Sequence, residues 1–115
     1  MPFLKIVTNV PESKIPPNYH VNLTNLLQEL LQKPIEYCSV QLQPGQIITF
    51  GGSHEPCAFI QLCSIGRLGP IGNVVHSEKI MTELENTLGI YPHLTYIHFI
   101  DLKPTDLNLN ISDSD

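Results

Sequence analysis

The sequence predicts a mixed α/β (α+β) domain in which two β-α-β repeats form one four-stranded sheet with two helices on one face. Two observations predict this class. Short segments with alternating apolar residues flank amphipathic helical segments, and this order recurs in both halves of the chain. A helix between two neighbouring strands implies a parallel pair with a right-handed connection. The length of 115 residues suits a single domain, over residues 1–115.

The first repeat begins with a strand over Phe3 to Thr8, which is rich in apolar and β-branched residues. Ser13 is a candidate helix cap, and Pro16-Pro17 suits the start of a helix. Lys33-Pro34 then ends the helix, because the residue before a proline avoids the helical region. Between these signals, leucines recur with helical spacing at positions 23, 26, 27, 30 and 31.

The second strand is expected over Tyr37 to Leu42, and a short strand is expected over Ile47 to Phe50 after a turn at Pro44-Gly45. The second repeat begins with a strand over Cys57 to Ile65, which glycines end.

Apolar residues from Ile80 to Leu88 mark the second helix, and Gly89 is a good residue to end it. Thr95 to Ile100 is the matching strand, with Thr95, Ile97 and Phe99 on one face. A last short strand is possible near Leu107 to Leu109.

Two helices on one side leave the other face of the sheet without cover. A homo-oligomer would supply that cover, and a solvated face is the alternative. The apolar character of both faces of the Cys57 to Ile65 strand favours the oligomer.

The composition excludes several classes of protein. The net charge is −5 with only six Lys and Arg and no basic run, which argues against nucleic acid as a partner. No apolar stretch is long enough to insert in a membrane, and the start lacks the features of a signal peptide, so we expect synthesis in the cytoplasm.

The three cysteines are expected to be reduced. Cys57 and Cys63 lie six residues apart on one predicted strand, or about 20 Å, which is too far for a disulfide. The five histidines show no spacing typical of metal ligands, and we predict neither a metal nor another cofactor.

Three features could carry chemistry, although each has an ordinary structural explanation. Removal of Met1 would make Pro2 a secondary amine, which can act as a base when burial keeps it neutral. Ser64-Ile65-Gly66 ends a strand before a glycine-rich turn, where backbone N–H groups can face an anion. Lys33 follows the first helix and could hold a carboxylate, or simply favour the helix dipole.

Together with their surroundings, these segments resemble the macrophage migration inhibitory factor family, including its D-dopachrome tautomerase branch. The resemblance rests on Pro2, Thr8-Asn9-Val10-Pro11, Lys33-Pro34 with Tyr37, and Tyr96-Ile97-His98-Phe99. Its most specific part is Gly-Gly-Ser-His-Glu-Pro-Cys-Ala at positions 51–58, followed by Ser-Ile-Gly at positions 64–66. It extends from Pro2 to about Leu102.

The resemblance implies a homotrimeric barrel with the helices outside and active sites between subunits. Pro2 would be the general base of a keto–enol tautomerase acting on phenylpyruvate-like or dopachrome-like substrates. The rest of the pocket would contain Lys33, the Ile65 N–H, Ser64 and Tyr37 from one subunit, with Tyr96 and His98 from its neighbour.

The chain departs from the family pattern at three places. His98 stands where the family often has Asn, and Ile60 replaces the second cysteine of a Cys-x-x-Cys motif. Residues from about 103 to 115 form a divergent acidic segment, with Asn108-Leu109-Asn110 in place of an aromatic lid. The loss of the aromatic lid argues against activity on bulky aromatic substrates, and Ile60 argues against thiol–disulfide oxidoreductase activity.

The resemblance also implies cytokine-like signalling, secretion by a route without a signal peptide, and a cell-surface receptor such as the invariant chain. The alternative to an active enzyme is therefore a secreted, cytokine-like binding protein whose tautomerase pocket is weak or vestigial.

Overall fold

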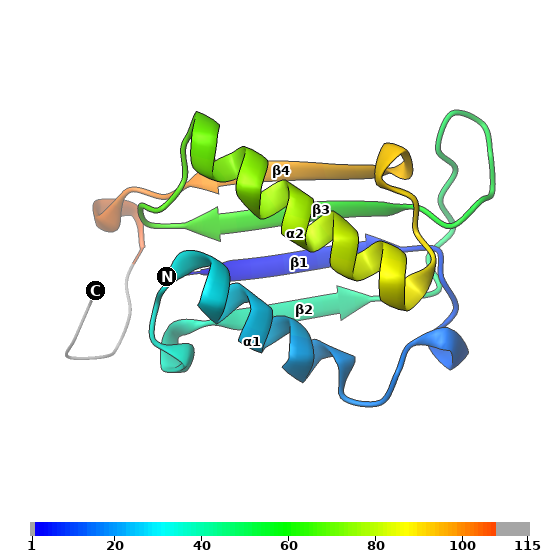
Figure 1. Cartoon of the computed structure of the whole chain (residues 1–115), viewed down its shortest axis with the longest axis horizontal. Helices are drawn as coiled ribbons and strands as arrows, with labels where there is room; N and C mark the ends of the chain where they lie inside the picture. Colours follow the sequence, from blue (N-terminus) through cyan, green and yellow to red (C-terminus); the bar gives the residue numbers. More distant parts are fainter. Residues whose placement is uncertain (1, 108–115) are drawn as a thin grey trace.

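The computed structural model describes residues 2–107, which form a four-stranded sheet with both helices on one face (Figure 1). The strands lie in the order β2-β1-β3-β4. β1 is parallel to β2, β3 is parallel to β4, and β1 is antiparallel to β3. The two parallel pairs confirm the two predicted β-α-β units. The elements are β1 (Phe3–Thr8), α1 (Tyr19–Leu31), β2 (Ser39–Gln43), β3 (Ala58–Ser64), α2 (Pro70–Leu88) and β4 (Thr95–Asp101).

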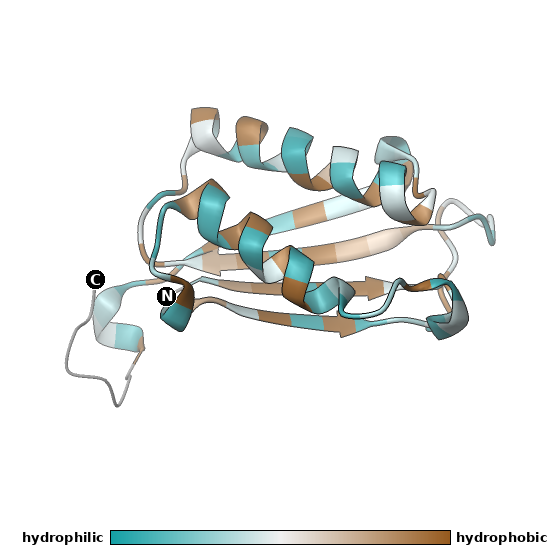
Figure 2. Cartoon of the chain, turned by 60° about the horizontal axis from the view of Figure 1, so that its bottom comes forward, coloured by the Kyte–Doolittle hydropathy of each residue, from teal (hydrophilic) through white to brown (hydrophobic). Residues whose placement is uncertain are grey.

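The core lies between the helices and the sheet. Successive side chains of a strand point to opposite faces, so Leu4 and Ile6 of β1 are buried on the helix side. Figure 2 shows the hydrophobic stripes of the helices turned toward the sheet. Three leucines of α1 spaced four apart, at positions 23, 27 and 31, and Ile80 and Leu84 of α2 are fully buried there.

The opposite face of the sheet has no helix on it within residues 2–107. Its middle row is polar, because Lys5 is level with Gln41 and Gln61, and Gln61 is level with His98. At one end of the sheet, Phe59 and Tyr96 are 46% and 62% exposed on this face. The expected uncovered face is therefore present, and it is polar in the middle and apolar at the end that holds Phe59 and Tyr96.

The start of α1 differs from the prediction. Ser13 is not a helix cap, because it lies in a short 3-10 helix over Glu12–Lys14. The α-helix begins at Tyr19, after Asn18 adopts a left-handed conformation with φ of 59°. Asn is among the few residues other than Gly that enter this conformation readily, so it can redirect the chain into the helix.

Two predicted strands also differ. Ile47 to Phe50 forms no strand, because Ile47 is fully exposed and only Phe50 makes an isolated bridge, to Ser53. The strand expected from Tyr37 begins at Ser39, after a 3-10 helix over Ile35–Tyr37.

The end of α2 is as predicted: Gly89 follows the helix in the left-handed region. Of the strand suggested near Leu107 to Leu109, Leu107 is not in a strand, and positions 108 and 109, like the acidic end of the chain, lie outside the described residues.

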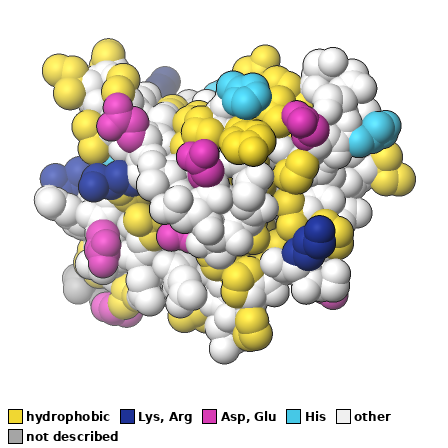
Figure 3. Space-filling model, turned by 45° about the vertical axis from the view of Figure 1, so that its right-hand side comes forward, with side chains coloured by type: hydrophobic (Ala, Val, Ile, Leu, Met, Phe, Trp, Pro, Cys, Tyr) yellow, Lys and Arg dark blue, Asp and Glu magenta, His cyan; other side chains and the backbone are white. Residues whose placement is uncertain are grey.

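The surface offers no extended charged patch on the side in Figure 3, where acidic and basic side chains are scattered among apolar and polar ones. Neither helix among residues 2–107 is long and apolar enough to cross a membrane.

Candidate active site

Pro2 lies at the end of the sheet where β1 begins and β3 ends (Figure 1). Its side chain is less than 2% exposed, and its carbonyl accepts a hydrogen bond of 3.1 Å from the Ser39 N–H. The last registered pair of the β1–β3 ladder is Phe3 with Cys63, so Pro2 comes next to Ser64. The fold thus places Pro2 beside the Ser64-Ile65-Gly66 turn, as a shared site requires.

A cavity of about 310 Å³ opens beside Pro2, lined also by Phe3, Ser39, Cys63, Leu102 and Leu107. Burial raises the pKa of the Cys63 thiol, which therefore stays protonated near neutral pH. Cys63 contributes a neutral wall to this cavity rather than a nucleophile. The apolar lining of this cavity suits an uncharged base.

Lys33 and Tyr37 come from the segment that connects α1 to β2, at the same end of the sheet (Figure 1). Gln32 ends α1 in a left-handed conformation with φ of 51°, which turns the chain back toward the sheet. Lys33 is consequently only 8% exposed, and Tyr37 is half-buried. Lys33 is thus a buried lysine at the same end of the sheet as Pro2, although it is not among the residues that line the cavity.

The turn after β3 presents Ile65 beside two residues in the left-handed region, Gly66 with φ of 75° and Arg67 with φ of 67°. Ser64 is fully buried, and its carbonyl accepts the Leu102 N–H at 2.8 Å. The Ser64 hydroxyl has no hydrogen-bond partner among the described residues. Because Ser64 alternates with Cys63, its side chain lies on the helix side of the sheet, behind the cavity wall.

Tyr96 and His98 do not join this group within one chain. Ile100 is level with Cys63 and Phe3, and Tyr96 lies four residues earlier on β4. Ideal sheet geometry places Tyr96 about 13 Å along the strands from Phe3 and about 10 Å across them. Tyr96 instead packs against Phe50, with ring centroids 5.1 Å apart, beside an apolar cavity of about 290 Å³. Any site that combines Pro2 with Tyr96 must use two copies of the chain.

The Thr8-Asn9-Val10-Pro11 motif and the motif at positions 51–58 meet at this far end of the sheet, in a contact that sequence reasoning missed. The Thr8 hydroxyl donates to the Cys57 carbonyl at 2.7 Å and accepts the Val10 N–H at 3.1 Å. The Asn9 amide donates to the Glu55 carbonyl at 2.9 Å, and its oxygen accepts the Cys57 N–H at 2.9 Å. We call Thr8, Asn9, Glu55 and Cys57 the loop clamp. It also explains why β3 begins at Ala58 rather than at Cys57, whose backbone is bonded to Thr8 and Asn9 side chains.

Comparison with known proteins agrees with this geometry. The family model described as macrophage migration inhibitory factor (MIF) matches residues 1–113. The MIF homolog of Brugia malayi is 36% identical over 110 residues, and MIF of Mus musculus is 34% identical over 110 residues, each alignment covering 96% of both chains.

Solved structures are equally similar. MIF from Oncomelania hupensis superposes with a TM-score of 0.93 at 33% identity, covering 96% of this chain and 79% of that one. MIF from Trichinella spiralis gives 0.90 at 34% identity, covering 94% and 96%. The match extends over nearly the whole chain, so this protein belongs to the macrophage migration inhibitory factor family.

Proposed function

We propose that this chain is a keto–enol tautomerase that uses the Pro2 amine as its general base. The observation that carries the proposal is the position of Pro2, buried beside an apolar cavity at the end of the sheet that also holds a buried lysine. An amine in apolar surroundings near a cation favours its neutral form, which is the form that accepts a proton. The family belongs to the tautomerase superfamily, which supports the same chemistry.

The reaction would move one proton between carbon and oxygen of a small α-keto acid such as phenylpyruvate, or of a dopachrome-like substrate. The Pro2 nitrogen takes the proton from the carbon next to the carbonyl and returns it to the oxygen, or does the reverse. Lys33 and the Ile65 N–H would hold the substrate carboxylate and carbonyl, where negative charge is present or develops. Tyr37 would shape the same end of the pocket, and Ser64 would support it from the helix side of the sheet.

We further propose that the active unit is a homotrimer in which Tyr96 and His98 of one subunit complete the pocket of its neighbour. Two features support an assembly: the helix-free face of the sheet, and the separation of Tyr96 from Pro2 within one chain. Sedimentation at micromolar concentration tests it. If the protein sediments as a monomer, Tyr96 and His98 do not belong to the site.

The test of the base is an enol–keto assay on phenylpyruvate with wild type, Pro2→Gly and Pro17→Gly. Pro17 is exposed before α1, at the opposite end of the sheet, so its replacement controls for the general effect of losing a proline. We expect Pro2→Gly to lose at least about 100-fold in kcat/KM, as is typical for a missing general base, and Pro17→Gly to keep wild-type activity. Full activity in Pro2→Gly would assign the base to another residue.

The mass of the mature chain is the second part of that test. If Met1 is still attached, the Pro2 nitrogen is an amide without a basic lone pair, and it cannot be the base. A folded trimer that is inactive on every small aryl pyruvate would instead favour the alternative function, a cytokine-like binding protein with a vestigial pocket. For that role we propose a cell-surface receptor such as the invariant chain, and export from the cytoplasm without a signal peptide.

A further inference from the structure

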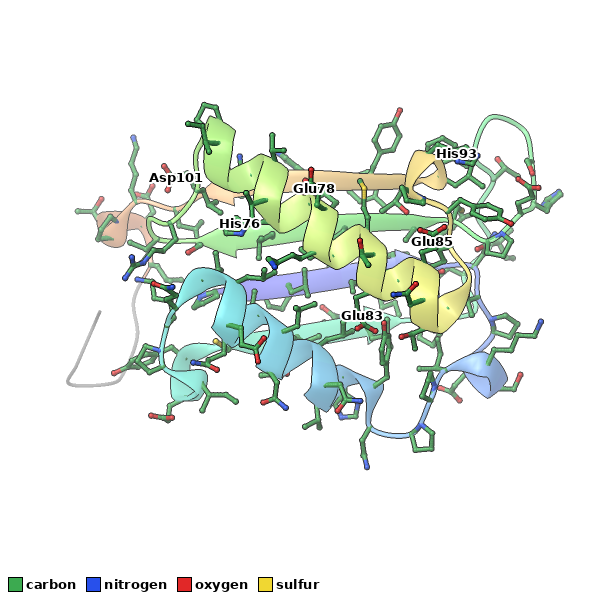
Figure 4. All side chains as sticks on the ribbon, viewed as in Figure 1. His76, Glu78, Glu83, Glu85, His93 and Asp101 are labelled. Atoms are coloured by element: carbon green, nitrogen blue, oxygen red, sulfur yellow. The ribbon has the colours of Figure 1, made fainter. Side chains whose placement is uncertain are left out.

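His76 is a buried histidine of α2 that the proposed mechanism does not use. Its side chain is only 7% exposed, and its ring lies beside Phe99 with centroids 6.5 Å apart. Figure 4 shows it on the first half of α2, at the end of the sheet where Asp101 ends β4 and far from His93.

One ring nitrogen of His76 contacts the turn that carries Ile65. The Nε2 atom lies 3.1 Å from the Arg67 carbonyl oxygen. A carbonyl oxygen only accepts hydrogen bonds, so Nε2 must carry the proton and donate it. Arg67 is also one of the non-glycine residues that adopt a left-handed conformation, with φ of 67°. Such a conformation is unfavourable for a residue with a Cβ atom and persists where surrounding contacts hold it.

The other ring nitrogen of His76 makes a histidine at this position unfavourable for the stability of the fold. The buried Nδ1 atom has no hydrogen-bond partner among the described residues. A phenylalanine would fill the same space beside Phe99 without burying an unsatisfied polar atom. The contribution that sets His76 apart from an apolar residue is therefore its hydrogen bond to the Arg67 carbonyl.

A second contact fixes the other end of the same turn. The Gly69 N–H donates to the Asn73 side-chain oxygen at 3.1 Å, and the Asn73 N–H donates to the Gly69 carbonyl at 2.7 Å. Gly72 lies against the hydrogen bond between His76 and Arg67, because a Cβ atom added there would be 3.5 Å from both the Arg67 oxygen and His76 Nε2. Residues in the first turns of α2 thus form hydrogen bonds with the segment from Ile65 to Gly69.

We propose that His76 is a positioning residue for the anionic end of the substrate. By donating Nε2–H to Arg67, it keeps the turn after β3 in the conformation that presents the Ile65 N–H to the pocket. This role rests on the tautomerase function proposed above, since it acts through the turn that would bind the substrate. His76 itself does not touch the substrate.

The test compares His76→Phe, which keeps the ring shape but loses the donor, with His76→Gln, whose amide nitrogen can reach the Arg67 carbonyl. His93→Phe is the matched control, because His93 is exposed at the far end of the sheet, stacked on Tyr91. In the full-length protein we expect His76→Phe to raise KM for phenylpyruvate about 5- to 10-fold, as the loss of one hydrogen bond predicts, with kcat within about twofold. His76→Gln and His93→Phe should stay within about twofold of wild type.

Amide hydrogen exchange of Gly69 gives a readout that does not depend on activity. We expect exchange to be about 5- to 10-fold faster in His76→Phe than in wild type or His76→Gln. Unchanged exchange would overturn the proposal even if the wild type proves inactive, whereas inactivity alone would refute only the tautomerase function. With an active wild type, unchanged KM in His76→Phe, or equal losses in His76→Phe and His76→Gln, would also overturn it.

The ring nitrogens of the wild-type protein provide a measurement that needs no variant to fold. Nitrogen chemical shifts distinguish the two neutral tautomers of histidine. We expect the proton on Nε2, and a proton found on Nδ1 instead would rule out the hydrogen bond to Arg67.

Discussion

Replacement of Thr8 by Val tests the loop clamp with almost no change of shape. Thr8 is fully buried at the end of β1, and its hydroxyl makes two hydrogen bonds, to the Cys57 carbonyl and from the Val10 N–H. Val has the same branching and nearly the same volume, so packing is kept while both bonds are lost. The Cys57 and Val10 backbone groups then stay buried without partners, because these residues are 1% and 4% exposed.

Each buried backbone group left unsatisfied costs about 1 to 3 kcal/mol, and the added methyl group offsets part of this. We therefore expect Thr8→Val to lower the free energy of unfolding by about 2 to 4 kcal/mol. At a typical dependence on urea for a chain of this size, the midpoint should fall by about 1 to 2 M. The assay is urea unfolding followed by circular dichroism at one fixed protein concentration, because the stability of an oligomer depends on concentration.

Thr24→Val is the matched control. The Thr24 hydroxyl also donates to a backbone carbonyl, that of His20 at 2.8 Å, but this bond is exposed on α1. Water can replace it, so we expect a change within about 0.5 kcal/mol. If Thr8→Val destabilises the protein no more than Thr24→Val does, the clamp is not the reason that the two motifs occur together.

Two further predictions concern the helices. The Tyr19 hydroxyl of α1 donates to the Glu83 carboxylate of α2 at 2.9 Å, and burial together with Glu83 raises the pKa of Tyr19 above its ordinary value of 10. As pH rises, the unfolded chain therefore loses this proton before the folded chain does, so the free energy of unfolding falls above pH 10. In urea unfolding series at pH 9 to 11, Tyr19→Phe should reduce the slope of that fall by up to about 1.4 kcal/mol per pH unit. Equal slopes in both proteins would contradict the prediction. Gly89 ends α2 with φ of 71°, and a Cβ atom added there would meet nothing within 4 Å. Gly89→Ala should therefore lower the free energy of unfolding by about 1 kcal/mol through backbone strain alone, as measured by thermal unfolding. An unchanged stability would show that the helix end relaxes without strain.

The sequence predicted those elements whose pattern reflects burial on one side. β1 alternates strictly between buried and half-buried residues, and its predicted bounds, Phe3 to Thr8, are those of the structure. The end of α2 was equally predictable, because Gly89 is the residue that a left-handed helix end favours. In these places a local signal and the tertiary contacts agree.

The start of α1 and the region before β3 were not predictable in the same way. Pro16-Pro17 favours a helix start, yet the chain enters the helix only after Asn18 reverses its direction. Cys57 continues the apolar pattern of β3, but side chains from the end of β1 take its backbone hydrogen bonds. Both outcomes depend on conformations or partners that are distant in sequence, and no local pattern contains them.

Four of the site residues predicted from the sequence lie at one end of the sheet, and their role there stays a prediction. Pro2, Lys33, Tyr37 and Ile65 come from three separate segments. The parallel pairing of β1 with β2 and the antiparallel pairing of β1 with β3 bring these segments to one end of the sheet. Sequence reasoning did not find His76, because a single histidine on a helix is usually structural. The signal that identifies it is a hydrogen bond to a strained residue nine positions earlier, which only the fold shows.

The Thr8-Asn9 motif and the motif at positions 51–58 lie at the opposite end of the sheet from Pro2, whereas the Ser64-Ile65-Gly66 motif lies at the same end as Pro2. β1 is six residues long, so the loop clamp at Thr8 is about 20 Å from Pro2. The clamp makes backbone contacts that any member with this fold could use, whether or not it is an enzyme. Family membership is therefore strong evidence for the fold and weaker evidence for catalysis. The chemical end depends on Pro2, Lys33 and the turn held by His76, and only changes at that end can decide whether this chain is a tautomerase.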